Sequence, residues 1–177
     1  MMNLPNKLTL LRIILVPVFI VVLMTGHYYI SAVIFVVASL TDMLDGKIAR
    51  KYDLVTDFGK LMDPLADKLL VMSALICLVQ LGDIPGWMAI VILGREFAIT
   101  GLRTVAASSG VVIAAGWTGK IKTVLQMIAV VLILLRNWPF VYLGIPMDQI
   151  VLWAAVVMTI VSGAEYIIKN RHVISTK

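Results

Sequence analysis

Long apolar runs separated by short polar breaks make up most of this chain. A helix needs about 20 apolar residues to cross a hydrocarbon core of roughly 30 Å, and several of the runs reach that length. Turn-forming segments lie between them at Gly26-His27, residues 82–86 and residues 137–139. This pattern predicts six transmembrane helices, at about residues 9–25, 29–49, 58–81, 85–107, 118–136 and 148–168.

The composition strengthens the membrane interpretation. Of 177 residues, 61% are hydrophobic and 14% are charged, and the mean hydropathy is +1.02. Soluble domains contain about 45–50% apolar and about 25% charged residues, so this chain lies outside their range. Its length suits one domain. We therefore expect an all-α integral membrane protein with a single transmembrane domain over residues 1–177.

Positive charge falls almost entirely on one side of the predicted topology. Every lysine and arginine except Arg136 belongs to the N-terminal segment, the connections at 42–68 and 95–122, or the C-terminal tail. Cytoplasmic loops carry such an excess, so we expect both termini and these connections to face the cytoplasm. Topology and anionic headgroups then explain the formal net charge of +5. The sequence offers no soluble basic face with interleaved aromatics, which argues against nucleic acid as a partner.

Four aspartates lie close together in residues 41–68, TDMLDGKIARKYDLVTDFGKLMDPLADK. Asp42 and Asp45 differ by three positions and Asp63 and Asp67 by four, so each pair shares one helical face. Carboxylates at bilayer depth are costly and mark functional sites. If the two helices meet, two divalent cations would offset the repulsion among the four carboxylates. The spacing therefore favours a two-metal site for displacement at phosphorus, in a polar cavity that faces the cytoplasm.

The residues between the aspartates fit a phosphate-containing substrate. Gly46 and Ala49 leave room beside the helix, and Arg50 can meet phosphate charge in bidentate fashion. One alternative is that the aspartates only form ion pairs with neighbouring lysines and Arg50. Another is a cation or proton transporter, which would place acidic residues along several spans. Asp83 and Asp148 instead lie in short turns on the far side, with no acidic ladder to the cluster.

The motif D-x-x-D-G-x-x-A-R, followed after eight residues by G-x-x-x-D-x-x-x-D, resembles the signature of the CDP-alcohol phosphotransferases, integral-membrane enzymes of phospholipid synthesis. It is matched in full by Asp42, Asp45, Gly46, Ala49, Arg50, Gly59, Asp63 and Asp67. The resemblance implies a six-helix fold and a pair of divalent cations, usually Mg²⁺ with Mn²⁺ as the alternative. It also implies that the first three aspartates bind the metal, with Asp67 beside them as the general base.

The same resemblance implies contacts to the CDP portion of CDP-diacylglycerol. They are Asn6, Thr9, Asp42, Asp45, Gly46, Ala49, Arg50, Thr56 and Gly59. The ordinary alternative for Asn6 and Thr9 is helix capping. For Gly59 it is helix packing.

Two further segments bear on the acceptor alcohol. Residues 3–12 (NLPNKLTLLR) and 94–123 resemble those of bacterial family members whose acceptor is sn-glycerol 3-phosphate. That dianion needs several cations. Arg95 and Arg103, eight residues apart, lie near one helical face, and Lys120 begins the next span on the same side. We expect these three to bind the acceptor phosphate, with Lys60 and Lys122 as weaker candidates, while Glu96 pairs with an unassigned cation.

Other acceptors remain open, namely phosphatidylglycerol, serine or inositol phosphate. The basic residues could also simply extend to lipid headgroups. With glycerol 3-phosphate, the expected reaction moves the phosphatidyl group of CDP-diacylglycerol to that acceptor and releases CMP. The resemblance further implies a homodimer among membrane lipids, in the cell membrane of a bacterium.

Overall fold

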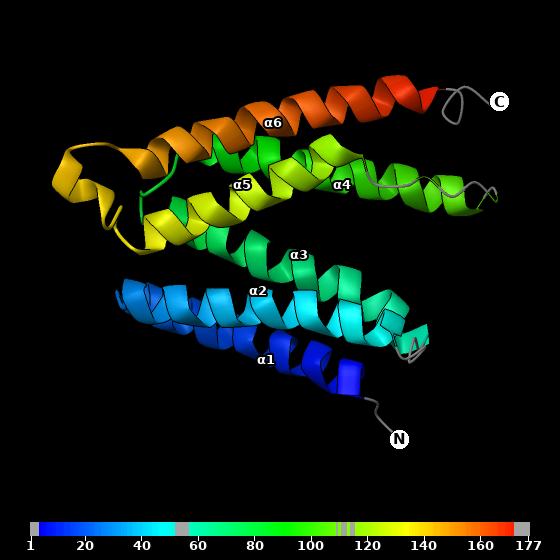
Figure 1. Cartoon of the computed structure of the whole chain (residues 1–177), viewed down its shortest axis with the longest axis horizontal. Helices are drawn as coiled ribbons and strands as arrows, with labels where there is room; N and C mark the ends of the chain where they lie inside the picture. Colours follow the sequence, from blue (N-terminus) through cyan, green and yellow to red (C-terminus); the bar gives the residue numbers. More distant parts are fainter. Residues whose placement is uncertain (1–3, 52–56, 109, 111–112, 114–115, 172–177) are drawn as a thin grey trace. The chain divides into compact units, whose positions relative to one another are not determined.

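The chain is all-helical in the part that the computed structural model describes. The structure describes the backbone of residues 4–51, 57–108, 110, 113 and 116–171, and the side chains of residues 9–41, 68–108, 110, 113 and 116–171. The α-helices in these ranges are α1 (Leu4–Met24), α2 (Tyr28–Lys51), α3 (Asp57–Gln80), α4 (Gly86–Ser108), α5 (Trp117–Leu134) and α6 (Met147–Lys169), with a short 3-10 helix η1 (Phe140–Leu143) (Figure 1). Each predicted apolar run is therefore a helix, with ends shifted by a few residues.

Helix ends follow the glycine signals of the sequence. Gly26 and Gly82, just after α1 and α3, have φ of +85° and +80°. This left-handed conformation suits glycine and ends a helix without steric strain. Residues 25–27 then join α1 to α2, and a connection this short makes the two helices antiparallel.

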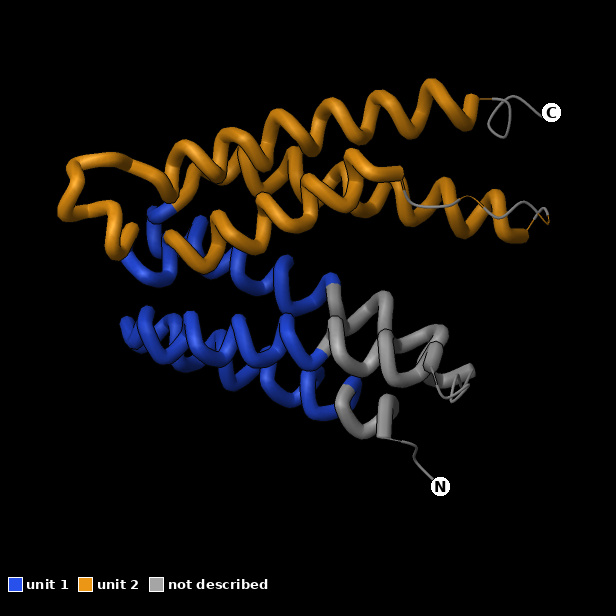
Figure 2. Tube along the Cα trace, in the orientation of Figure 1, with its two compact units in different colours: residues 1–83, 133–136 blue, residues 84–132, 137–177 orange. Residues whose placement is uncertain are grey.

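The structure divides into two compact units (Figure 2). The first contains residues Met1–Asp83 and Ile133–Arg136, and the second contains Ile84–Leu132 and Asn137–Lys177. In the first unit α1 packs on both α2 and α3, and α2 also contacts α3. Phe19 and Phe35 meet across α1 and α2 with ring centroids 6.0 Å apart, and both are fully buried. These rings belong to a largely apolar core, which also includes buried polar residues of α1 and α2.

At one end of the first unit, three side chains form a polar clasp. The Tyr28 hydroxyl donates to Asp83 Oδ2 at 2.8 Å. Arg136 Nη1 donates to Asp83 Oδ1 at 3.1 Å, and the Arg136 guanidinium lies 3.7 Å from the centroid of the Tyr28 ring. The clasp therefore ties the start of α2, the turn after α3 and residue 136 together.

The second unit is organised around the contact between α4 and α6. Trp87 and Trp153 meet across it with ring centroids 5.4 Å apart. Both helices run in the same direction, and α5 runs the opposite way (Figure 1). Ile92, Ile99 and Ala106 are buried on α4 at intervals of seven residues. Arg95 and Arg103 fall near the same face, so this apolar face carries two cations.

Large apolar side chains cover the outside of the helices. On α6, Trp153, Val157 and Ile160 are about half exposed, whereas Thr159 and Ser162 are buried. Extended exposed apolar surface is typical of contact with lipid or another protein. By length and composition, α5 and α6 alone among the described helices meet a criterion for a full membrane span, and shorter apolar stretches occupy residues 9–24, 28–41 and 68–80. The prediction of six spans remains a prediction.

Candidate functional site

The aspartate motif falls on two helices that pack against each other. Positions 42 and 45 lie within α2, and positions 63 and 67 lie within α3. Both pairs therefore have the helical spacing that the sequence predicts. The side chains of residues 42–67 and of Asn6 lie outside the described part of the structure. The metal and nucleotide roles of Asp42, Asp45, Gly46, Ala49, Arg50, Thr56, Gly59, Lys60, Asp63 and Asp67 stay predictions.

Thr9 and Arg12 are buried polar residues on α1. Thr9 has no exposed surface and is the sixth residue of its helix, so it does not occupy the capping position. Arg12, one turn later, is 1% exposed. A buried charge must be compensated by its surroundings, which makes Arg12 a candidate that the sequence reasoning missed. The sequence feature that could have identified it is an arginine inside the apolar stretch LTLLRIILV.

Two acceptor candidates, one on α4 and one on α5, meet at Glu96. Arg95 Nη1 donates to Glu96 Oε1 at 3.0 Å, and Lys122 Nζ donates to the same oxygen. The Lys122 side chain is only 2% exposed, and those of Arg95 and Glu96 are 15% and 20% exposed. We expected Glu96 to pair with one cation, and in the structure it pairs with two. Burial strengthens both ion pairs, because little water is present to screen them.

Helix α6 supports the two arginines of α4. A Cβ added at Gly163 would lie 3.2 Å from Arg95 Cγ, so the glycine lets the arginine stem lie close to α6. One turn later, the buried Tyr166 contacts Arg103: Arg103 Nε donates to the Tyr166 hydroxyl at 3.2 Å. The guanidinium also lies 5.4 Å from the centroid of that ring. Sequence reasoning missed Gly163 and Tyr166, which lie more than 60 positions away from their arginine partners.

The two lysines of α5 have different surroundings. Lys120 is exposed, and its Nζ lies 4.8 Å from the centroid of the exposed Trp117 ring. Positions two apart on a helix differ by about 200°, so Lys120 and Lys122 point to nearly opposite sides. The structure therefore joins Lys122, the weaker candidate, to Arg95 through Glu96, and places Lys120 over Trp117.

Among the described residues of α4 and α5, three cations are buried or half-buried. Arg95, Arg103 and Lys122 carry three positive charges, and Glu96 removes one. The balance of two positive charges matches a phosphate monoester dianion. Arginine also offers parallel N–H groups that fit phosphate oxygens.

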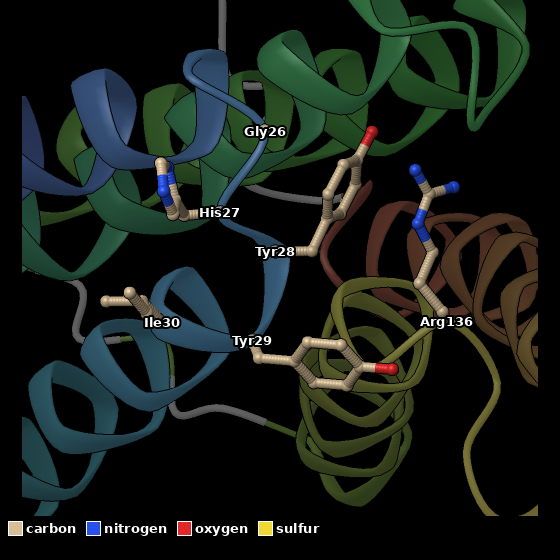
Figure 3. Close-up of a pocket in the computed structure, with 6 residues that line it drawn as sticks. All are labelled: Gly26, His27, Tyr28, Tyr29, Ile30 and Arg136. Atoms are coloured by element: carbon tan, nitrogen blue, oxygen red, sulfur yellow. The ribbon is translucent and has the colours of Figure 1, made fainter.

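A pocket of about 670 Å³ lies at the turn between α1 and α2. It is lined by Gly26, His27, Tyr28, Tyr29, Ile30 and Arg136 (Figure 3). Figure 3 shows the Arg136 guanidinium beside the Tyr28 ring, and Arg136 is already paired with Asp83. Position 42 lies about 21 Å further along α2, at 1.5 Å per residue. This pocket is therefore separate from the aspartate motif.

Comparison with known proteins identifies the family. The model of the family described as CDP-alcohol phosphatidyltransferase matches residues 2–161. A Bacillus subtilis protein named CDP-diacylglycerol–glycerol-3-phosphate 3-phosphatidyltransferase is 49% identical, with 99% of each chain covered. Proteins of the same name from Rickettsia typhi (42% identical, covering 94% of this chain and 96% of theirs) and Haemophilus influenzae (36%, covering 93% and 91%) are also similar.

These matches cover the whole length of the motif and of the acceptor candidates. They agree with the resemblance inferred from residues 42–67, and they give the transporter alternative no support. Because the family model matches most of the chain, and relatives above 30% identity cover nearly all of it, this membrane-associated protein belongs to the CDP-alcohol phosphatidyltransferase family.

Proposed function

We propose that the chain transfers the phosphatidyl group of CDP-diacylglycerol to sn-glycerol 3-phosphate, which forms phosphatidylglycerophosphate and releases CMP. The observation that carries the proposal is the 49% identity, over 99% of both chains, to the Bacillus subtilis protein named for this reaction. The cations that Glu96 and α6 hold on α4 and α5 add independent support, because this acceptor is a dianion.

The aspartates of α2 and α3 are proposed to hold the divalent metal on which this family generally depends. The donor set fits such a metal, since carboxylate oxygens are the hard ligands that Mg²⁺ prefers. Asp42, Asp45 and Asp63 are the proposed ligands, with Asp67 beside them. Two Mg²⁺ ions are the proposed species, and Mn²⁺ is the alternative. When bound, the metal would neutralise negative charge on the diphosphate.

Asp67 is proposed to act as the general base. It accepts the proton of the acceptor hydroxyl, whose oxygen forms a bond to the lipid-linked phosphorus. The bond between this phosphorus and the bridging oxygen breaks, and CMP leaves with the electron pair. Arg50 stabilises negative charge on the phosphates during the transfer. The remaining proposed contacts to CDP-diacylglycerol are Asn6, Thr9, Gly46, Ala49, Thr56 and Gly59.

The acceptor phosphate is proposed to bind Arg95, Arg103 and Lys122. Their support is that Glu96 and α6 hold all three in the second unit. Lys120 and Lys60 stay as further candidates. In this proposal the six helices span the cell membrane of a bacterium as one domain, with the site and both termini in the cytoplasm, and the chain forms a homodimer.

The acceptor assay tests this function directly. Purified protein in lipid nanodiscs receives labelled CDP-diacylglycerol and Mg²⁺, together with glycerol 3-phosphate, phosphatidylglycerol, serine or inositol phosphate. We expect CMP release with glycerol 3-phosphate, and we expect it to stop when EDTA removes the metal and to return when Mg²⁺ is restored. Release of CMP with another of these acceptors, but not with glycerol 3-phosphate, would disprove the proposed substrate.

A further inference from the structure

Glu96 presents a problem for the acceptor site as described. Its carboxylate contacts Arg95 and Lys122, two cations that the proposed function assigns to the acceptor phosphate. A negative charge at this point weakens the attraction of the site for a dianion. It also occupies N–H groups that could otherwise bind phosphate. Attraction for the acceptor dianion therefore gives no reason for a carboxylate at this position.

We infer that Glu96 is a positioning residue that holds Arg95 of α4 and Lys122 of α5 in the arrangement that binds the acceptor phosphate. This inference rests on the proposed function. Both cations have long side chains, and they come from different helices. A single carboxylate oxygen that accepts from both of them orders the pair before the substrate arrives. Groups that are ordered in advance lose less conformational entropy when the ligand binds.

The contacts of Arg95 show which edge of its guanidinium remains for phosphate. Nη1 is used by Glu96. Nε is buried, and among the described residues it has no hydrogen-bond partner. A buried N–H without a partner is costly, and a phosphate oxygen would satisfy it. Nε and Nη2 form the side edge of the guanidinium, which suits two parallel bonds to phosphate.

Glycines of α5 and α6 leave space around this arginine. A Cβ added at Gly119 would lie 3.5 Å from Arg95 Nη2, and one added at Gly163 would lie 3.2 Å from Arg95 Cγ. The first glycine keeps the region beside Nη2 free of a side chain. The second lets the stem of the arginine rest on α6. Glu96 and Gly163 thus constrain Arg95 from two sides.

The competing explanation is that Glu96 only neutralises the buried ammonium group of Lys122. The two explanations predict opposite changes in substrate affinity. Glu96→Gln keeps the size of the side chain and one acceptor oxygen but removes the charge. If Glu96 positions the cations, the weaker bonds of the amide release them and affinity for the acceptor falls. If it is only a counter-charge, its removal strengthens attraction and affinity rises.

Steady-state kinetics with each substrate varied in turn separates the two explanations. For Glu96→Gln we expect the KM for glycerol 3-phosphate to rise about tenfold, because small displacements of binding groups are amplified in such sites. The KM for CDP-diacylglycerol should change less than about twofold. Glu165→Gln is the matched control, because Glu165 pairs with Lys169 on the exposed side of α6. It should leave both constants unchanged.

Binding without turnover provides a second measurement. Glycerol 3-phosphate alone should raise the unfolding temperature of the wild-type protein in detergent, and the rise should be smaller for Glu96→Gln at the same concentration. Gly163→Ala tests the other constraint, because its Cβ would displace the stem of Arg95. We expect it to raise the KM for glycerol 3-phosphate severalfold. Gly101→Ala on α4 is its control, since a Cβ there meets no atom within 4 Å.

The outcomes distinguish this inference from the proposed function. If the wild-type protein releases CMP with glycerol 3-phosphate, but its KM is unchanged or lower in Glu96→Gln, only the positioning role is disproved. If Glu96→Gln fails to fold, an unchanged KM in Gly163→Ala disproves the role of these constraints on Arg95. If the wild-type protein does not use glycerol 3-phosphate at all, the proposed function fails and the inference fails with it.

Discussion

Buried charge is confined to a few residues of the described chain, and each has a different environment. Arg12 and Lys122 are each about 1% exposed, whereas Lys120 lies in the open over Trp117. Removing a charge from water is costly unless partners compensate for it. Substitutions at buried charges should therefore have larger effects than substitutions at exposed ones.

Asp67 provides the residue-scale prediction. Asp67→Asn keeps the shape of the side chain but cannot accept a proton from the acceptor hydroxyl. We expect turnover to fall by at least about 100-fold, the usual contribution of a general base. CDP-diacylglycerol binding should be retained at least in part, because Asp42, Asp45 and Asp63 remain. CMP release measures the first quantity, and equilibrium binding of labelled CDP-diacylglycerol measures the second. Substantial residual turnover would exclude Asp67 as the essential base.

At the scale of elements, glycines and a polar clasp together secure one end of the first unit. Glycines in the left-handed conformation end α1 and α3. The clasp of Tyr28, Asp83 and Arg136 then ties together three points that are far apart in sequence. Asp83 is central, since both other side chains bond to it, and its own side chain is 16% exposed. Loss of this carboxylate leaves two polar groups without their acceptor.

The clasp therefore predicts a change in stability without a change in chemistry. Asp83→Ala should lower the free energy of unfolding in detergent by about 1–2 kcal/mol, because it removes the half-buried hydrogen bond to Tyr28 and the exposed one to Arg136. Tyr28→Phe should lower it by about 1 kcal/mol, because it removes the half-buried bond alone. Denaturant unfolding followed by tryptophan fluorescence measures both values. Tyr142→Phe is the control, because Tyr142 is 80% exposed. Equal stability of all three variants and the wild type would mean that the clasp contributes nothing.

At the scale of the whole molecule, the central question is how the helices cross the membrane. Within the part of the chain that the structure describes, α5 and α6 meet the criterion of length and apolar character for a membrane span. Among the described residues, α1 carries Arg12, and α4 carries Arg95, Glu96 and Arg103 within its length. Functional groups facing a polar cavity explain why a true span can contain charge. The distribution of lysine and arginine predicts that the aspartate motif faces the cytoplasm.

Cysteine labelling tests this topology. Cys77, the one cysteine in the sequence, is first replaced by serine. Single cysteines are then introduced at Tyr142, which precedes α6, and at Arg171, which follows it; both residues are exposed. We expect a membrane-impermeant maleimide to label Tyr142→Cys in intact cells and Arg171→Cys only after permeabilisation. Labelling of both positions from the same side would show that α6 does not cross the membrane.

The sequence by itself determined the helices, their turns, the aspartate spacing and the family. These depend on local patterns: apolar runs define helices, glycine permits the turns, and positions three or four apart share a helical face. It also predicted that Glu96 pairs with a cation, and the ion pairs with Arg95 and Lys122 confirm this.

Only the tertiary structure decided which distant residues meet. Helical spacing places Lys120 and Lys122 on opposite sides of α5, but it does not say which side packs against Glu96. Tyr166, Gly163 and the clasp of Tyr28, Asp83 and Arg136 were equally beyond local patterns. Their contacts join residues dozens of positions apart, and they depend on how whole helices pack through their side chains.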